Sequence, residues 1–192
     1  MEQRHSDIQK LNARLLRMAR HTCLNDADAA PGILGIETDA VAAMRSIPEQ
    51  ELLVTFASLH QVCAVLADPT ELVLTIRKGM PEGMPDDYFI NTASNEAAYF
   101  LLNQEFLLKA HEICRNSTAE GCRYFGVVAP AVALLASASI DVLNYYAWQP
   151  RPVFRLILSE SSLAGLRGMP REIVDICSVL RRPPTKIIHF HG

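Results

Sequence analysis

The sequence predicts an all-α fold built from two tandem copies of one helical unit. Two observations predict this fold: a helical segment recurs 91 residues later in the chain, and apolar residues in both copies follow helical spacing. With 192 residues, 49% of them hydrophobic, the chain can bury a sizeable core in one domain or in two small ones.

The recurring segment reads LNARLLRMARHTC from Leu11 and LNQEFLLKAHEIC from Leu102. Both copies keep Asn, Leu, Ala and Cys at matching places, and further matches follow at the same offset. Near the end of each copy, KGMP at Lys78 returns as RGMP at Arg167. An almost ungapped register over most of each copy indicates a tandem duplication.

The duplication predicts four segments along the chain. We expect a first helical repeat over 1–80, a linker over 81–98, a second repeat over 99–182 and a tail over 183–192. The stretch GMPEGMPDDYFINTASN around the predicted linker is rich in Gly, Pro and Asp, which is typical of a connection between domains.

A long amphipathic helix is expected to open each copy, because apolar residues step by three or four along it. In the first copy these residues are Ile8, Leu11, Leu15 and Met18. In the second copy they are Tyr99, Leu102 and Phe106, and Ile113 follows seven residues further on. The polar segments that follow, 25–31 and 116–121, suit either a turn or a short helix.

Each copy should then contain two shorter helices. Gly35 and Gly126 are expected to supply tight turns before Ala- and Val-rich helices. The helix starts should be marked by Thr38 or Asp39, by Ser46 followed by Pro48 and Glu49, by Pro130, and by Ser139 with Asp141. The β-branched segments QVCAVL (61–66) and PVFRLILS (152–159) fit either short strands or extended connectors.

Composition limits the function classes. A net charge of −3 and a pI near 6.1 argue against a broad polybasic nucleic-acid surface, although they leave room for a small basic patch. No apolar run is long enough for a membrane span, and the polar start MEQRHSDIQK does not fit a secretory signal. We expect a cytoplasmic protein with reduced thiols, because the cysteines are odd in number and contain no CxxC: Cys23, Cys63, Cys114, Cys122 and Cys177.

A family resemblance rests on short motifs in the same order in both copies. The first copy carries Leu11-Asn12 with Ala19, then LGI at Leu34, then QVC at Gln61. The second carries Leu102-Asn103 with Ala110, then FGV at Phe125, then VFR at Val153. This order resembles FlhD, the D subunit of the bacterial flagellar master transcriptional regulator, over about 60 residues of each copy.

The resemblance implies an all-helical protein that pairs as a homodimer, binds a zinc-containing C subunit and activates flagellar promoters. Two FlhD-like repeats in one chain would then pack as an intramolecular pseudo-dimer. Tethering places the halves at an effective concentration on the order of millimolar and lets them diverge, because neither must pair with an identical copy.

The expected interface of the pseudo-dimer uses the opening helices: Leu11, Asn12, Leu15, Leu102, Asn103 and Phe106. A buried asparagine on an apolar helix face fixes the register of packing, because other arrangements leave its amide unsatisfied. The alternative is an exposed asparagine kept by descent.

The two copies differ where the resemblance places functional residues. Cys63 occupies the position of the family's dimer-bridging cysteine, whereas Phe154 stands 91 residues later, so a symmetric disulfide between the halves is not expected. Arg14, Arg17 and Arg20 correspond to Glu105, Leu108 and His111, so any basic stripe is one-sided.

The end of each copy holds the weak DNA-binding candidates, which are Arg77, Lys78, Arg167, Arg171, Arg181 and Arg182. Each cation could neutralise a phosphate. Equally, cations at a helix C-terminus are stabilised by the helix dipole and need no ligand.

No metal site, cofactor or catalytic centre is predicted. His111, Cys114 and Cys122, and the terminal His189 and His191, do not offer four zinc ligands at a recognisable spacing. We therefore expect a non-enzymatic transcriptional regulator with a C-type protein partner and promoter DNA, and further self-association stays open. The alternatives are an adaptor or antagonist without DNA binding, and an unrelated helical enzyme with a cleft between the halves.

Overall fold

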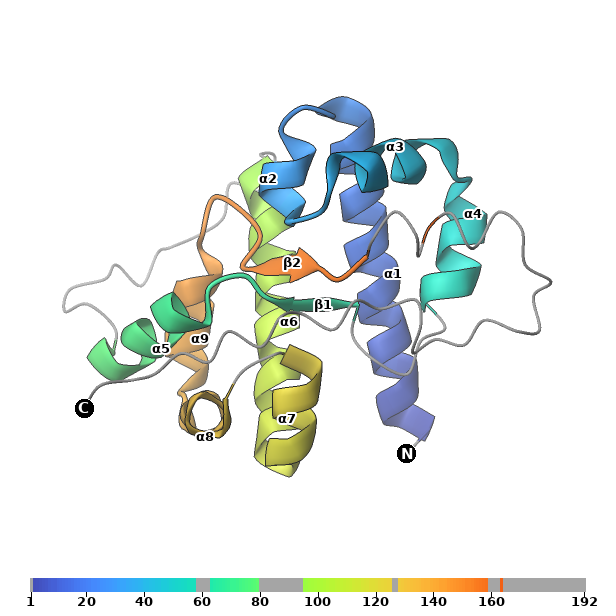
Figure 1. The fold of residues 1–192 in the computed structure, drawn as a ribbon. Coiled ribbons are helices and arrows are strands. Elements are labelled where there is room, and N and C mark those ends of the chain that lie inside the picture. The colour runs from blue at the N-terminus through green and yellow to red at the C-terminus, as the bar shows by residue number, and fades with distance from the viewer. Residues whose placement is uncertain (1, 58–62, 80–94, 126–127, 159–162, 164–192) are drawn as a thin grey trace. The chain divides into compact units, whose positions relative to one another are not determined.

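The computed structural model describes residues 2–57, 63–79, 95–125, 128–158 and 163. This part of the chain is mostly helical, as the sequence predicts, and it contains one pair of short strands (Figure 1). It divides into two compact units, with boundaries inside the strands, between Val65 and Leu66 and between Phe154 and Arg155. Within the described ranges, no helix is long and apolar enough to cross a membrane.

The first unit is arranged around one long helix, α1 (Glu2–Asn25). After α1 come α2 (Ala30–Leu34), α3 (Thr38–Ser46), α4 (Glu49–Leu52), the π-helical turn η1 (Leu53–Ala57) and β1 (Ala64–Leu66). Helix α1 contacts α2, α3, α4 and η1, which explains why its apolar face is buried. The buried residues of that face are Ile8, Leu11, Leu15, Leu16, Ala19 and Cys23.

The second unit is arranged around α6 (Asn95–Asn116). Its other elements are α5 (Pro69–Lys78), α7 (Thr118–Phe125), α8 (Ala129–Ser137), α9 (Ile140–Ala147) and the first residue of β2 (Phe154–Leu156). Phe106 on α6 is fully buried and packs edge-to-face on Phe125, with ring centroids 5.6 Å apart, and at a tilt on Phe154, at 5.2 Å. Aromatic pairs at these separations add to the stability that burial alone supplies.

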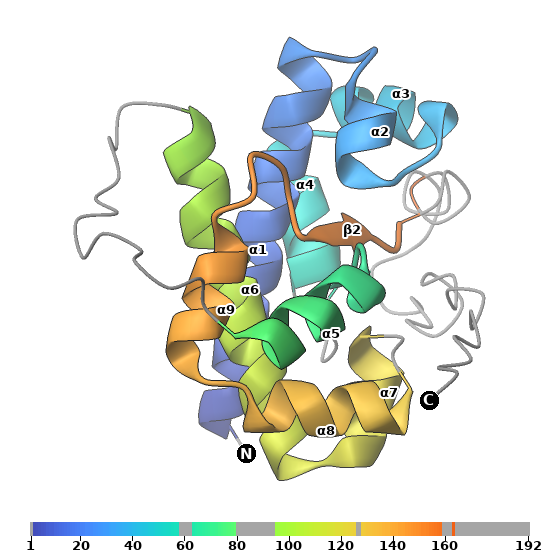
Figure 2. The same cartoon turned by 90° about the vertical axis from the view of Figure 1, so that its left-hand side faces the viewer.

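The two central helices begin the same order of elements. Helix α1 is followed by α2, α3, α4 with η1, and β1, whereas α6 is followed by α7, α8, α9 and β2. Strand β2 begins 90 residues after β1. Helix α5 follows β1 in the chain but packs in the second unit, against α8 and α9 (Figure 2).

The expected helix starts hold in the second unit. Ser139 is the N-cap of α9, and its Oγ accepts a hydrogen bond from the backbone N–H of Val142 at 3.3 Å. Pro130 lies in the first turn of α8, where a proline costs no intrahelical hydrogen bond.

Two expected helix starts in the first unit are wrong. Ser46 is the last residue of α3, and its hydroxyl donates to the Ala43 carbonyl instead of capping α4. Helix α3 ends before Ile47, because a proline favours extended backbone in the residue that precedes it. Pro48 itself is the N-cap of α4. Glu37, rather than Thr38 or Asp39, precedes α3, and it makes no side-chain cap bond.

Gly35 forms the expected tight turn at the end of α2. Its φ of 66° and ψ of 31° are left-handed, and its N–H donates to the Pro31 carbonyl. A Cβ at this position would lie 2.6 Å from Cβ of Arg155, closer than any side chain tolerates. Gly126 lies outside the described residues.

Candidate functional site

The two strands form one antiparallel ladder. The Ala67 N–H donates to the Val153 carbonyl at 2.9 Å, and the Ile157 N–H donates to the Cys63 carbonyl at 3.1 Å. The first bond lies within the second unit, and the other lies within the first unit. Both segments that the sequence left open as strand or connector therefore contain strand residues.

Asn12 anchors the entrance of β1. Its side chain is fully buried on α1, and its Oδ1 accepts a hydrogen bond from the backbone N–H of Cys63 at 2.9 Å. The residue just before the strand is thus tied to the central helix of the same unit. A buried amide or N–H left without such a partner would cost about 1–3 kcal/mol.

Asn103 anchors the entrance of β2 in the same way. Its Oδ1 accepts from the backbone N–H of Val153 at 3.0 Å. Its Nδ2 donates to the carbonyls of Ala147 and Arg151, at 3.1 and 3.0 Å, so the side chain also fixes the connection between α9 and β2. We call Asn12 with Cys63 and Asn103 with Val153 the strand anchors.

All six residues expected at the pseudo-dimer interface are buried. Leu11, Asn12, Leu15, Asn103 and Phe106 are at most 1% exposed, and Leu102 is 7% exposed. The register-fixing role of Asn12 and Asn103 requires that both side chains be buried, as they are. The alternative of two exposed asparagines kept by descent is therefore wrong. The described hydrogen bonds of the asparagines go to backbone beside the strands, and the interface assignment of the six residues stays a prediction.

Cys63 is a free, fully buried thiol, and the resemblance to a family with a bridging cysteine at this position stays a prediction. Burial raises the pKa of the Cys63 thiol to about 12, and a hydrogen bond with its own backbone offsets this only in part. The thiol is therefore protonated at neutral pH, which makes it a poor nucleophile for disulfide formation.

The arginines of α1 have contacts within the first unit. Nε of Arg17 lies 3.1 Å from Oε1 of Glu49, which joins α1 to α4. Nε of Arg20 donates to the Ile47 carbonyl at 3.1 Å, at the junction of α3 and α4. The sequence alone shows these arginines only as part of a basic stripe, because the carboxylate and carbonyl that they contact lie 32 and 27 residues away in sequence.

Of the six DNA-binding candidates, the structure places two. Arg77 and Lys78 are exposed in the last turn of α5, where the helix dipole favours cations. Arg167, Arg171, Arg181 and Arg182 lie outside the described residues. Whether the six form one basic surface stays a prediction.

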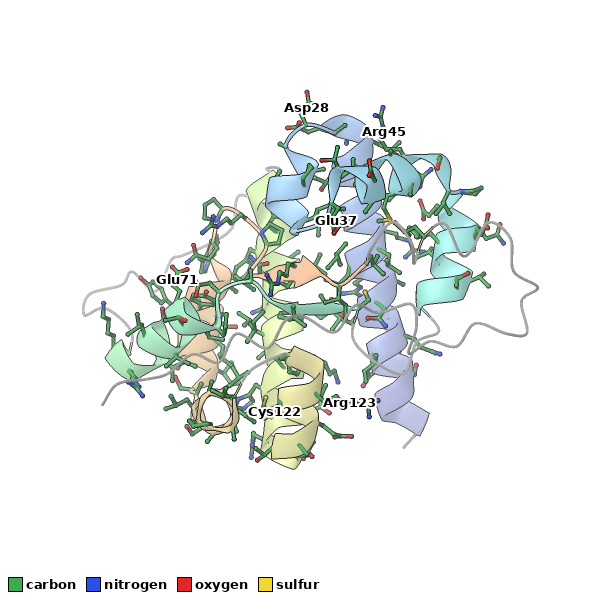
Figure 3. All side chains as sticks on the ribbon, viewed as in Figure 1. Asp28, Glu37, Arg45, Glu71, Cys122 and Arg123 are labelled. Carbon is green, nitrogen blue, oxygen red and sulfur yellow. The ribbon has the colours of Figure 1, made fainter. Side chains whose placement is uncertain are left out.

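The first unit presents mostly carboxylates between residues 26 and 52. Arg45 is the only Lys or Arg in this stretch, and the side chains of Asp28 and Arg45 point outward from the helices (Figure 3). The exposed acidic residues are Asp26, Asp28, Glu37, Asp39, Glu49 and Glu51. The corresponding stretch of the second unit, residues 117–143, carries only Glu120, Arg123 and Asp141.

His111 of the considered zinc cluster is bound to backbone. Its Nδ1 donates to the Leu135 carbonyl at 2.8 Å, in a buried position between α6 and α8. Cys114 is buried against Gly121, where an added Cβ would lie 2.8 Å from its Sγ. In the part of the chain that the structure describes, no three His, Cys, Asp or Glu residues are grouped to hold a metal ion, and His189 and His191 lie outside it.

No protein-family model matches the chain. No curated protein and no solved structure matches it either.

Proposed function

We propose that this chain is a transcriptional regulator of the flagellar master-regulator type. Two FlhD-like halves would pair within one chain as a pseudo-dimer, bind a C-type partner subunit and position the complex at a promoter. The observation that carries this proposal is the pair of strand anchors: asparagines 91 residues apart accept hydrogen bonds from backbone amides 90 residues apart, each beside a strand.

The anchors support common descent of the halves more strongly than sequence matches do. Ala- and Leu-rich helices match by chance, whereas a buried asparagine bonded to the residue before a strand is a specific three-dimensional relation. The shared order of a long helix, shorter helices and a strand supports the same reading.

A second function, an adaptor or antagonist without DNA binding of its own, is favoured by the acidic stretch of the first unit. Exposed carboxylates repel phosphates, so the surface around α2, α3 and α4 is unsuited to the DNA backbone. An asymmetric chain that binds the C-type subunit but presents little basic surface would withhold that subunit from promoters.

One experiment separates the two functions. The purified chain is mixed with the C-type subunit of its host, and co-elution and promoter mobility shifts are measured at several salt concentrations. Co-elution with a promoter shift supports the activator, and co-elution that abolishes the shift produced by the C-type subunit supports the antagonist. If neither co-elution nor a shift occurs, both proposals fail.

Charge reversal at α5 tests the DNA contact directly. Replacing Arg77 and Lys78 by glutamate should weaken promoter binding and reduce the slope of log K against log salt by about 2, since each phosphate contact contributes roughly 0.9. Arg45→Glu is the matched control, because Arg45 is also exposed near a helix C-terminus but lies among carboxylates. An unchanged slope in the α5 variant with intact partner binding would remove these residues from the DNA surface.

A further inference from the structure

Two free thiols of the second unit lie on neighbouring helices. Cys114 is in the last turn of α6 and Cys122 is on α7, and Ser117 alone separates the two helices. Cys114 is only 3% exposed, whereas Cys122 is half-buried on α7 (Figure 3). One thiol is therefore inside the unit, and the other is within reach of solvent.

Gly121 allows α7 to pack closely on the sulfur of Cys114. A Cβ built on Gly121 would lie 2.8 Å from Sγ of Cys114 and 2.8 Å from Cγ1 of Val132 on α8. The Cys114 sulfur therefore lies against the residue that directly precedes Cys122. Because consecutive Cα atoms are about 3.8 Å apart, rotation of the Cys114 side chain brings its sulfur toward Cys122.

The turn between the two helices is held by hydrogen bonds. The Ser117 N–H donates to the Ile113 carbonyl at 3.0 Å, and the Gly121 N–H donates to the Ser117 carbonyl at 2.9 Å. Oγ of Ser117 also accepts from the N–H of Glu120 at 3.2 Å. These bonds fix the start of α7 against the end of α6, on the segment that joins the two cysteines.

The two thiols also interact electrostatically. Burial, and then the charge of Cys122, raise the pKa of the Cys114 thiol to about 12. Such an influence between two side chains requires a short separation, in agreement with the contact at Gly121. Cys114 is therefore protonated at neutral pH, and a dissolved oxidant reaches the more exposed Cys122 first.

The first half of the chain lacks this pair of thiols. Cys23 stands 91 residues before Cys114 and is also buried near the end of a central helix. The residue that corresponds to Cys122 is Pro31. Cys23 is therefore a comparison within the same protein: a buried cysteine without a second thiol eight residues later.

We propose that Cys122 and Cys114 form an oxidation site that takes a hydroperoxide as its oxidant and closes to a disulfide. The Cys122 sulfur attacks the peroxide, so that an S–O bond forms, the O–O bond breaks, and water or an alcohol leaves with the thiol proton. The Cys114 sulfur then attacks the Cys122 sulfur; the S–S bond forms, the S–O bond breaks, and water leaves with the Cys114 proton. The two sulfurs supply the two electrons that reduce the peroxide, and a dithiol reductant restores both thiols.

The disulfide should change the packing of the second unit. Sγ of Cys114 must leave its place against Gly121 and Val132, so α7 loses part of its contact with α8. We expect faster backbone hydrogen exchange in α7 and α8 of the oxidised chain, with α1 unchanged. Equal exchange in the two forms would contradict this change in packing. The inference goes beyond the proposed function and does not depend on it, since it uses only contacts within the second unit.

Peptide mapping of the full-length chain after treatment with hydrogen peroxide tests the site. Trypsin cleaves after Arg115, so Cys114 falls in peptide 110–115 and Cys122 in peptide 116–123. We expect these two peptides, linked by a disulfide, as the main product. At a fixed peroxide concentration, the rate should not change when the protein is diluted about tenfold, because the linking step is intramolecular. Linkage of Cys122 to Cys177, to a second chain or to no thiol would overturn the proposal.

Single variants test the order of the two steps. Cys114→Ser should accumulate a sulfenic acid at Cys122, which dimedone traps on peptide 116–123, and absence of this adduct would overturn the proposal. Cys122→Ser should leave Cys114 reduced, and oxidation of Cys114 in this variant would contradict the order. Cys23→Ser is the matched control and should form the disulfide at the rate of the parent chain. If Cys114→Ser does not fold, Cys114→Ala removes the thiol without burying a hydroxyl and should give the same adduct.

Discussion

The backbone N–H of Cys63 and the side-chain Oδ1 of Asn12 lie 2.9 Å apart, in the interior of the first unit. The bond spans 51 residues of sequence and joins the central helix to the start of a strand. Its counterpart in the second unit joins Asn103 to Val153. In each unit a single asparagine side chain joins segments about 50 residues apart in sequence, so replacing it should measurably lower the stability of the protein.

Asn12→Ala should lower the free energy of unfolding by about 1–3 kcal/mol, because the Cys63 N–H is left buried without its acceptor. Asn103→Ala should lower the free energy of unfolding further, since the Ala147 and Arg151 carbonyls also lose a hydrogen-bond donor. Urea unfolding followed by circular dichroism measures both losses. Asn25→Ala is the control, because Asn25 is exposed, and it should change stability by less than about 0.5 kcal/mol. Equal effects of all three substitutions would contradict the role of the anchors.

Gly35→Ala should destabilise the protein by about 2 kcal/mol or more. A left-handed backbone costs a non-glycine residue roughly 1–2 kcal/mol, and the new Cβ would also collide with Arg155. Gly32→Ala serves as the internal comparison, since a Cβ there meets nothing within 4 Å in helix α2 and should stabilise it by about 0.5–1 kcal/mol. Thermal melts of the pair should shift in opposite directions, and parallel shifts would disagree with the backbone geometry.

Asp68→Ala should cost about 1–2 kcal/mol through loss of the cap of α5. The loss should appear in the fluorescence of Trp148, the only tryptophan of the chain, which stacks on Phe100 at 4.2 Å in the same unit. Asp28→Ala, an exposed carboxylate in the turn before α2, is expected to leave the transition within about 0.5 kcal/mol of the parent. An unchanged midpoint for Asp68→Ala would mean that α5 contributes nothing to the second unit.

Stability should fall with alkaline pH because of the buried thiols. Burial raises the pKa values of Cys63 and Cys114 to about 12, against a reference value of 9.0 for an exposed thiol. Below pH 9 each thiol is protonated in both the folded and the unfolded state, so its full contribution to the free energy of unfolding is present. Between pH 9 and 12 only the unfolded state releases it, so each thiol lowers the unfolding free energy by up to about 1.4 kcal/mol per pH unit.

The pH effect is measured by comparing Cys63→Ala with the parent chain. The variant should lose some stability at pH 8, where a cavity replaces the thiol. The gap between the two chains should then narrow as the pH rises above 9, because the variant lacks one titrating group. A gap that stays constant up to pH 11 would show that the Cys63 thiol titrates alike in the folded and unfolded chains.

Local patterns in the sequence predicted the helices and part of the anchors. The apolar spacing around Leu11 and Leu102 identified the long helices, and repetition singled out Asn12 and Asn103 as polar residues with a buried role. The cap predicted at Ser46 is wrong, because a serine two residues before a proline resembles a helix cap, whereas α3 ends there through the constraint that Pro48 places on Ile47.

Local sequence patterns do not predict contacts between segments that are far apart in the chain. Nothing local to α5 indicates that it packs against α8 and α9, and nothing around Tyr146 indicates that its hydroxyl meets the Asp68 carbonyl. The bond from each asparagine to the amide just before a strand also depends on how the chain returns from η1 or α9, which no periodicity encodes. Non-local pairings of this kind follow from the packing of whole elements rather than from any short stretch.

The strand anchors do not restrict which side chains stand at positions 63 and 153. Asparagine bonds to main-chain N–H, a group that every amino acid except proline possesses. The hydrogen bond therefore does not depend on the side chain of the residue that donates it. This residue is a cysteine in the first unit and a valine in the second. Substitutions at these two positions, other than to proline, should therefore leave each hydrogen bond and the backbone path that it holds in place.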